Sequence, residues 1–188
     1  MNLEFQTPRG TQGRIRDWAG RDFPAFAEIN AEVEVMRYLL GPLDMEAARA
    51  LFEKIQNKNS ENGWGIWAVE VDGDLAGFTG LNRPNFITHF TPCVEIAWRF
   101  RKAFWRQSIA YAAAQSVLDY GFQQLGLEEI VAFTTESNHR SRRLMERLDM
   151  SYQAKDDFPH PGLEAGHPLS PHVLYRISKE RATRLATE

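Results

Sequence analysis

Apolar side chains recur along the chain at two spacings, and each spacing predicts one kind of element. Within residues 22–30 and 44–55 they return every three or four positions, which is the period of a helix with one buried face. Asp22 and Asp44 precede these runs and are predicted to cap the two helices. The second helical pattern already begins near Glu34, ahead of a Gly-Pro break.

Alternating and continuous apolar runs predict the strands. A short first strand is expected over residues 14–18, and a polar loop over 57–63. Residues 65–71 and 74–81 are extended runs on either side of an Asp-Gly pair, which favours a tight antiparallel hairpin. Residues 91–100 alternate between apolar and polar side chains and form the next predicted strand.

The second half of the chain predicts helix and strand in alternation. A helix is expected over residues 109–125, a buried strand over 129–135, a helix opened by Ser137 and Asn138, and a last strand over 172–177. The stretch between the strands at 95 and 135 is long enough for a right-handed parallel crossover. The fold class is therefore mixed α/β or α+β, with a mostly antiparallel central sheet flanked by helices.

Composition narrows the class of protein. The chain has 188 residues, 43% of them apolar, which suits one domain with a substantial core. Its 22 basic and 25 acidic residues make nucleic acid a poor first partner. A lone Cys93 and the lack of a secretion signal or an apolar run long enough to span a bilayer predict a cytoplasmic protein without a membrane partner.

One turn has the setting of a phosphate site. Residues 105–115 read W-R-Q-S-I-A-Y-A-A-A-Q, a turn that opens a helix, and the unpaired N–H groups of a helix start attract anions. The turn contains no glycine. Ser108 suits a helix start if its φ is helical, whereas a positive φ would strain Arg106, whose guanidinium can itself reach a phosphate. The phosphate interpretation is expected to hold if both residues are helical or extended.

Several segments resemble one enzyme family when they are taken in order. They are E-V-M-R-Y-L-L-G-P-L from residue 34, D-L-A-G-F-T-G-L from 74, V-E-I-A-W-R-F from 94, Y-G-F-Q-Q-L-G-L-E-E-I from 120, and N-H-R-S-R-R-L-M-E-R-L-D-M from 138. The chain resembles the GNAT N-acetyltransferases, in the branch related to the ribosomal-protein N-terminal (RimJ/RimL-like) acetyltransferases. The resemblance covers residues 9–178 as one domain and leaves 179–188 as a C-terminal tail.

The resemblance implies transfer of an acetyl group from acetyl-CoA to an amine, with no metal. It also implies the residues that hold the cofactor. The end of the central strand would meet the pantetheine arm, the following loop would hold the pyrophosphate, and the Asn-x-x-Ser motif would lie near the thioester. These positions are, in that order, Trp98, Arg99 and Phe100; Trp105, Arg106, Gln107, Ser108, Ile109 and Ala110; and Asn138 and Ser141.

The chain departs from the family pattern at several glycines. Relatives typically read Trp-Gly-x-Gly-x-Ala in the loop, where this chain has Arg106 and Ser108 in place of the glycines. The usual glycine of the central strand is Ala97, and the glycine that usually follows the last helix is Asp149. The cofactor loop is the least faithful part of the resemblance.

Two residues are the candidate catalytic groups. Ser141 lies on the inward stripe of its helix, and with the resemblance it is expected to protonate or stabilise the departing thiolate; its plain alternative is a bond to its own helix. Glu95 lies on the polar side of its strand, where it would take a proton from the amine or serve as an ordinary strand carboxylate. Other candidates for the base are Glu136, Asp156 and Asp157.

The leading hypothesis is direct attack of a neutral amine on the thioester, with either a peptide N-terminus or a small-molecule amine as acceptor. The alternative is a catalytically impaired CoA-binding or interaction module with an altered loop, and a hydrolase is a distant third because no G-x-S-x-G elbow is present. The three histidines from His160 to His172 lack the paired spacing of a zinc site and are expected in a solvated loop. A homodimer is left open.

Overall fold

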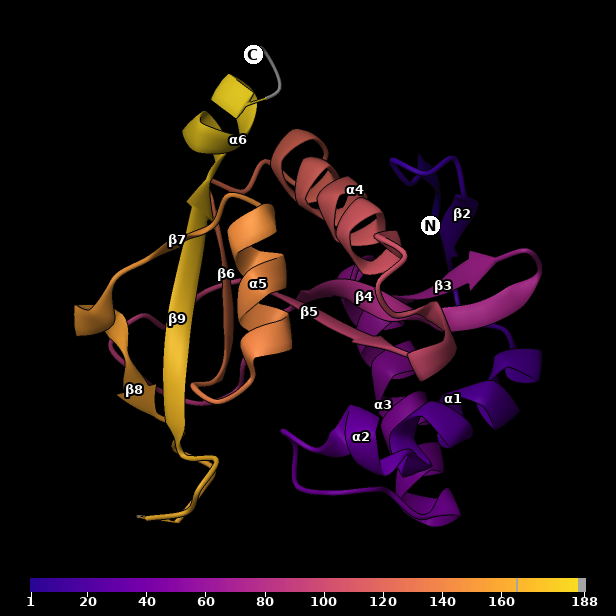
Figure 1. The fold of residues 1–188 in the computed structure, drawn as a ribbon, viewed down its shortest axis with the longest axis horizontal. Coiled ribbons are helices and arrows are strands. Elements are labelled where there is room, and N and C mark those ends of the chain that lie inside the picture. Colours follow the sequence, from indigo (N-terminus) through magenta and orange to yellow (C-terminus); the bar gives the residue numbers. More distant parts are fainter. Residues whose placement is uncertain (165, 186–188) are drawn as a thin grey trace. The chain divides into compact units, whose positions relative to one another are not determined.

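Helices and strands of a mixed α/β fold follow one another along the chain (Figure 1). The computed structural model describes residues 1–164 and 166–185, and side chains as far as residue 182. Two units can be distinguished: Met1–Leu81 with Ala97–Val117, here called the first unit, and Asn82–Ile96 with Leu118–Glu188, the second unit.

Four antiparallel strands run through the first unit. They pair in chain order: β1 (Asn2–Gln6), β2 (Gln12–Arg16), β3 (Ile66–Val71) and β4 (Asp74–Asn82). The predicted hairpin is confirmed, with left-handed φ of 52° at Asp72 and 86° at Gly73. β1 was not predicted, because only Phe5 of that strand is buried and the alternation of its side chains is weak.

An aromatic core packs the helices of the first unit against β3 and β4. The helices are α1 (Phe23–Ala31), α2 (Val33–Met36) and α3 (Met45–Asn62), with a 3-10 turn η1 (Gly20–Asp22) ahead of α1. Residues of α1 and α3 form the core together with Ala68, Leu75 and Phe78. Trp18 is half-buried and packs against this core, edge-on to Phe26 and Phe52.

The helix caps and the end of α3 test the sequence predictions. Asp44 caps α3 as predicted, its Oδ1 accepting from the Ala47 N–H at 2.8 Å. Asp22 stands before α1, but its carboxylate accepts from Ala19 and Arg16 instead of capping that helix. The polar loop expected over 57–63 is wrong: α3 continues to Asn62 because Asn59 exchanges hydrogen bonds with Ile66 of β3, which gives this polar turn a partner.

Arg16 connects two buried carboxylates in the first unit. Its guanidinium donates to Asp22 at 2.7 and 2.8 Å and to Glu70 at 2.7 Å. Burial by itself raises the pKa of each carboxyl, but the hydrogen bonds from Arg16, joined by those of Ala19 to Asp22 and of Arg14 to Glu70, outweigh burial and hold both pKa values below their usual range.

The lowered pKa values predict loss of stability in acid. A carboxyl whose pKa is lowered on folding stabilises the protein above its unfolded pKa and loses that effect as the pH falls through its folded pKa. The free energy of unfolding should therefore fall from about pH 4.5 downward, which urea titrations at a series of pH values would measure. Asp22→Asn should flatten this slope, whereas Asp17→Asn, at an exposed carboxylate, should leave it unchanged; an equal slope in Asp22→Asn would contradict the prediction.

The second unit combines parallel and antiparallel strand pairing. The start of β5 (Glu95–Phe100) pairs in parallel with β6 (Glu129–Thr135), with Glu95 opposite Val131. β9 (Pro171–Ser178) pairs antiparallel with β6, with β7 (Ser151–Tyr152) and with β8 (Phe158–Pro159). The strand predicted over 91–100 begins only at Glu95, because Pro92 has no N–H for a ladder.

Helices complete both halves of the chain. They are η2 (Lys102–Phe104), α4 (Ile109–Gln123), α5 (His139–Arg147), η3 (Ala154–Asp156) and α6 (Lys179–Leu185). α5 lies alongside β6 (Figure 1). The predicted tail 179–188 starts as α6, and its last three residues lie outside the described part of the chain.

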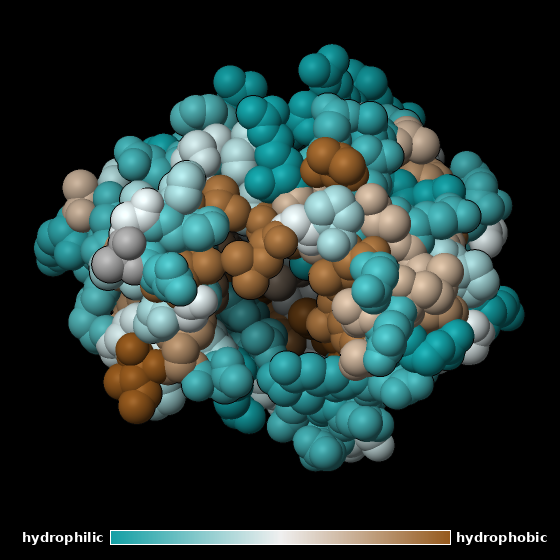
Figure 2. Space-filling model, turned by 90° about the horizontal axis from the view of Figure 1, so that it is seen from below, coloured by the Kyte–Doolittle hydropathy of each residue, from teal (hydrophilic) through white to brown (hydrophobic). Residues whose placement is uncertain are grey.

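Hydrophilic residues cover most of the face drawn in Figure 2, with smaller hydrophobic areas among them. Four of the large exposed apolar side chains come from one stretch, residues 33–45: Val33, Leu39, Leu40 and Met45. None of the helices in the described residues is long and apolar enough to cross a bilayer.

Candidate active site

The predicted phosphate loop joins the end of β5 to the start of α4 within the first unit. Two side-chain hydrogen bonds hold its path: the Trp105 indole Nε1 donates to the Phe100 carbonyl at 2.9 Å, and the Gln107 amide donates to the Ala103 carbonyl at 2.6 Å. The Ser108 carbonyl then accepts from the Ala112 N–H at 3.0 Å and so begins α4. As at any helix start, the N–H groups of the first turn have no acceptor within the helix.

Arg106 and Ser108 are both left-handed, with φ of 61° and 62°. The condition under which the phosphate interpretation is expected to hold, helical or extended backbone at both residues, is therefore not met, and Ser108 is not an ordinary capping serine, whose φ would be negative. Both residues occupy positions at which the resemblance to the family implies glycine, the residue that adopts positive φ without steric penalty. The loop keeps a backbone path suited to glycine although its side chains are those of arginine and serine.

Asp149 repeats this behaviour at the end of α5. Its φ is 57°, and the Met150 and Asp149 N–H groups donate to the Met145 and Glu146 carbonyls, which is the bonding pattern of a helix that ends in a left-handed residue. Three of the positions at which the resemblance implies glycine are thus left-handed in this chain, although none of them is a glycine.

Glycine at the two loop positions is expected to stabilise the protein. A left-handed residue with a Cβ costs about 1–2 kcal/mol, part of which is offset because glycine has more freedom in the unfolded chain. Arg106→Gly and Ser108→Gly should each raise the free energy of unfolding by about 0.5–1 kcal/mol in urea titrations.

Gln107→Gly is the matched control, because Gln107 lies between the two residues and has a negative φ. Glycine there relieves no strain and also removes the hydrogen bond from the Gln107 amide to the Ala103 carbonyl, so it should lower stability by about 1–2 kcal/mol. Equal effects of all three substitutions would show that Arg106 and Ser108 carry no backbone strain.

The side chain of Arg106 does not fold back over the loop. Arg106 is exposed, and it makes no hydrogen bond or ion pair with any residue in the described part of the chain. The Ile109 side chain is fully buried at the start of α4 and anchors the helix beneath the loop. The guanidinium of Arg106 is therefore available to an anion.

A close approach of two strands positions the end of β5. A Cβ on Gly77 of β4 would lie 2.4 Å from the Arg99 carbonyl oxygen, so only glycine lets the backbones come this near. The Thr79 hydroxyl donates to the Ala97 carbonyl at 2.9 Å. Phe100 is buried, and its carbonyl already accepts from Trp105, so that acceptor is partly used before any ligand binds.

Three of the predicted site residues lie in the second unit, around β6. Glu95 accepts a hydrogen bond from the Asn82 amide at 2.6 Å, and it stands opposite Val131 of β6. Asn138 caps α5, its Oδ1 accepting from the Ser141 N–H at 3.3 Å, and its Nδ2 donates to the Thr134 hydroxyl of β6 at 2.9 Å. The Asn138 side chain thus connects the first turn of α5 to β6. Ser141, which is half-buried, lies in that turn.

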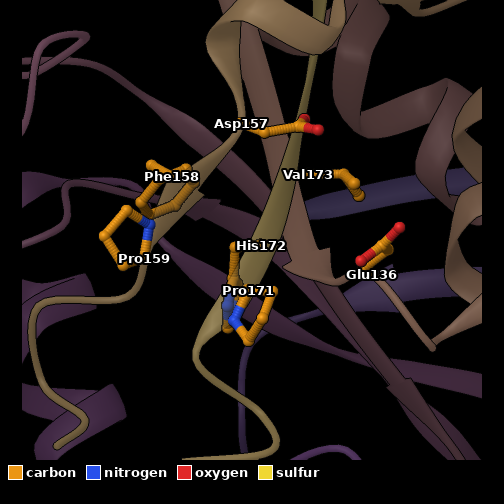
Figure 3. A pocket seen from close by; sticks show the side chains of 7 residues that line it. All are labelled: Glu136, Asp157, Phe158, Pro159, Pro171, His172 and Val173. Atoms are coloured by element: carbon orange, nitrogen blue, oxygen red, sulfur yellow. The ribbon is translucent and has the colours of Figure 1, made fainter. Parts of the chain in front are cut away.

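The other candidate bases have different surroundings. Asp156 is held by Arg176 at 3.0 Å. Glu136 and Asp157 line a cavity of about 300 Å³ in the second unit, together with Phe158, Pro159, Pro171, His172 and Val173 (Figure 3). Asp157 accepts from the Tyr152 hydroxyl at 2.8 Å. Sequence reasoning named both carboxylates but missed the cavity, because β8 and the start of β9 meet only in the folded chain.

Two of the three histidines, His160 and His172, lie in an aromatic cluster, which corrects the expectation of a solvated loop for these two. The rings of His160 and His172 are 4.9 Å apart between centroids, and His160 lies edge-on to Phe86. Burial lowers the pKa of both imidazoles. Within residues 1–164 and 166–185, no three His, Cys, Asp or Glu side chains gather in a way that could hold a metal ion.

Cys93 packs against the same cluster, and burial raises the pKa of its thiol to about 11. The thiol is therefore protonated at neutral pH, which agrees with its interpretation as a small apolar residue and not a nucleophile.

Comparison with known proteins identifies the family. Residues 14–151 match the model of the acetyltransferase (GNAT) domain. The chain is similar to the FsC-acetyl coenzyme A-N(2)-transacetylase of Aspergillus fumigatus, at 28% identity over 177 residues that cover 88% of this chain and 72% of that protein.

Solved structures show the same fold. A GNAT-family acetyltransferase from Bacillus anthracis superposes with a TM-score of 0.75 at 24% identity, over 96% of this chain and 99% of that one. RimJ of Mycobacterium smegmatis, in complex with CoA-disulfide, has a TM-score of 0.74 at 18% identity, over 99% and 93%. The predicted fold class, a mostly antiparallel sheet flanked by helices, is confirmed. The chain belongs to the GNAT family and is an N-acetyltransferase that uses acetyl-CoA as its acetyl donor.

Proposed function

We propose that this chain acetylates a primary amine, on a peptide N-terminus or a small molecule, by direct attack of the neutral amine on the thioester. The observation that carries the proposal is the backbone of residues 105–108, which leads from β5 into α4 with two left-handed residues. A loop of this kind aims successive N–H groups at a bound anion.

The pyrophosphate of the donor is assigned to residues 105–110. N–H groups at the start of α4 would bind its oxygens, and the exposed guanidinium of Arg106 would add a charged donor. Backbone groups of Trp98, Arg99 and Phe100 would meet the pantetheine arm, with the Phe100 carbonyl the least available of these. Bound acetyl-CoA supplies an activated carbonyl carbon and a thiolate leaving group.

Glu95 is proposed as the base and Ser141 as the acid. The amine nitrogen forms the new bond to the acetyl carbon while its proton passes to the Glu95 carboxylate, directly or through water. The C–S bond then breaks, and the Ser141 hydroxyl protonates or hydrogen-bonds the departing sulfur. The Asn82 amide holds one carboxylate oxygen of Glu95, and Asn138 holds the turn that carries Ser141.

Each unit offers, by itself, one candidate segment for contact with the acceptor. Residues 33–45 expose apolar side chains, whereas Glu136 and Asp157 place two carboxylates around the cavity of the second unit. Carboxylates favour the approach of an ammonium group, which must lose its proton before it attacks.

Calorimetry with acetyl-CoA and an acetyl-transfer assay test the proposal. The assay would follow CoA release with free-N-terminal peptides, polyamines and amino sugars as acceptors. Micromolar binding of acetyl-CoA and transfer to at least one class of amine are expected. Absence of binding would overturn the assignment of the loop, and binding without transfer to any amine would favour the impaired binding module.

A further inference from the structure

Arg99 carries a positive charge into the first unit on the side of β5 that faces α1. Its Nη1 donates to the Asn30 side-chain oxygen, and its guanidinium lies over the Phe78 ring at 5.2 Å from the centroid. Asn30 is fully buried and Phe78 nearly so, and Phe78 belongs to the core that α1 and α3 form with β4. Both contacts are to neutral groups.

The charge of Arg99 has no carboxylate partner in the described part of the chain. The other cations nearby are paired: Arg101 with Glu28 at 3.2 Å, and Lys102 with Glu32 and Glu34. The acidic residues of α1 and α2 are thus committed elsewhere. Burial without a compensating anion lowers the pKa of Arg99 to about 10, which still leaves the guanidinium charged at neutral pH.

A purely structural role explains this arrangement poorly. Asn30 is itself anchored, its Nδ2 donating to the Phe26 carbonyl at 2.7 Å and its backbone carbonyl accepting from Leu43 at 2.8 Å. The side-chain oxygen of Asn30 accepts a hydrogen bond from one of the five N–H donors of the Arg99 guanidinium. A half-buried cation without a counter-charge is destabilising, and an apolar residue of similar size would pack on Phe78 without that penalty.

The position of Arg99 distinguishes its anion from the phosphates of the donor. The donor phosphates are assigned to the loop that opens α4, whereas the partners of Arg99 lie on the side of the strands covered by α1 and α3 (Figure 1). Asn30, the partner of Arg99, lies near the end of α1. Residues 33–45, which come directly after α1, carry the exposed apolar side chains assigned to the acceptor.

We propose that Arg99 binds a carboxylate of the amine acceptor, so that the preferred acceptors are amino acids or peptides with an acidic group near the amine. This inference rests on the proposed function. The guanidinium, held in place by Asn30, presents its remaining donors as a planar fork that fits a carboxylate in two hydrogen bonds. Arg99 is thus a specificity-determining residue and not a catalytic one.

Matched acceptors that differ only in a carboxylate test the inference. The rate of CoA release would be compared for glutamate and glutamine, for aspartate and asparagine, and for peptides that begin with each of the four. The wild-type protein should favour the acid over the amide by about 10- to 100-fold in kcat/KM, mostly through KM. Arg99→Met should abolish that preference. Because only backbone groups of Arg99 are assigned to the pantetheine arm, and its side chain contacts Asn30 and Phe78, the affinity for acetyl-CoA should change by less than about 3-fold.

Two further variants keep the test decisive. Arg99→Lys retains the charge but not the fork, so it should fold and show an intermediate preference even if the methionine variant does not fold. Arg101→Met removes a neighbouring arginine already paired with Glu28, and it should keep the full preference. Circular dichroism confirms the fold of each variant.

The outcomes separate the two proposals. Transfer at equal rates to acids and amides would overturn the role of Arg99 and leave the proposed function standing. If Arg99→Met binds acetyl-CoA more weakly than the wild-type protein does, the anion that Arg99 binds belongs to acetyl-CoA. That result would also overturn the proposed role of Arg99 in acceptor binding. Failure of the wild-type protein to acetylate any amine would overturn the proposed function, and with it this inference.

Discussion

Glu95→Gln is expected to lower kcat/KM by about 100- to 10,000-fold, because an amide cannot take the proton of the attacking amine. The substitution preserves size and shape, and the Asn82 amide can still donate to the remaining carbonyl oxygen. Affinity for acetyl-CoA and thermal stability should therefore stay near those of the wild-type protein. The activity of the variant should rise with pH as more of the acceptor becomes neutral, which steady-state kinetics over a pH series would show.

Three carboxylates serve as controls for this assignment. Asp156→Asn loses an ion pair with Arg176, and Glu136→Gln and Asp157→Asn alter the cavity of the second unit. Each should change kcat by less than about 10-fold, because none of them is assigned the proton of the amine. A large loss of kcat in one of these variants, with Glu95→Gln nearly unchanged, would move the base to that residue.

Arg16→Met is expected to lower the free energy of unfolding by about 3–5 kcal/mol, because the buried Asp22 carboxylate loses its guanidinium partner and Glu70 loses one of its two. The side chain of Arg16 is 12% exposed, and those of Asp22 and Glu70 are 4% and 8% exposed. Glu70 keeps Arg14, but the Asp22 carboxylate loses both of its guanidinium hydrogen bonds. Urea titration at neutral pH measures the loss.

Arg14→Met is the matched control, since its side chain is 48% exposed and Glu70 would keep Arg16. Its loss should be about 1 kcal/mol or less. Adding Asp22→Asn to Arg16→Met should recover part of the stability, because the uncompensated charge disappears. Equal losses of stability in Arg14→Met and Arg16→Met would contradict this prediction. They would show that the burial of Arg16 does not determine how much it contributes to the free energy of unfolding.

Most helices and strands could be predicted from the sequence because their signals are local. The Asp-Gly pair set the hairpin between β3 and β4, and Asp44 marked the start of α3. Prediction failed where a distant partner decides the outcome. The end of α3 depends on hydrogen bonds between Asn59 and β3, and β1 is held mainly by its pairing with β2.

The positions of the candidate site residues along the chain could be predicted from the sequence. The residues that surround them in the folded chain could not. The motifs placed Glu95, Asn138 and Ser141, and the capping role of Asn138 follows from its residue type. Nothing in the pattern around Asn30 indicated that its amide would meet Arg99, because the two residues are 69 positions apart. The cavity of Glu136 and Asp157 was equally hidden, since β8 must first pair with β9.

The sequence by itself determined the order of elements, the family and the place of the phosphate loop, because periodicity, caps and motif spacing are properties of neighbouring residues. Only the tertiary structure decided the backbone of Arg106 and Ser108. Neither side chain favours a positive φ, so the anchored ends of the loop impose it: Trp105 is tied to Phe100, and Ile109 is buried at the start of α4. The hydrogen bond and the buried side chain at the two ends of the loop thus hold these positions on a backbone path for which the family resemblance implies glycine.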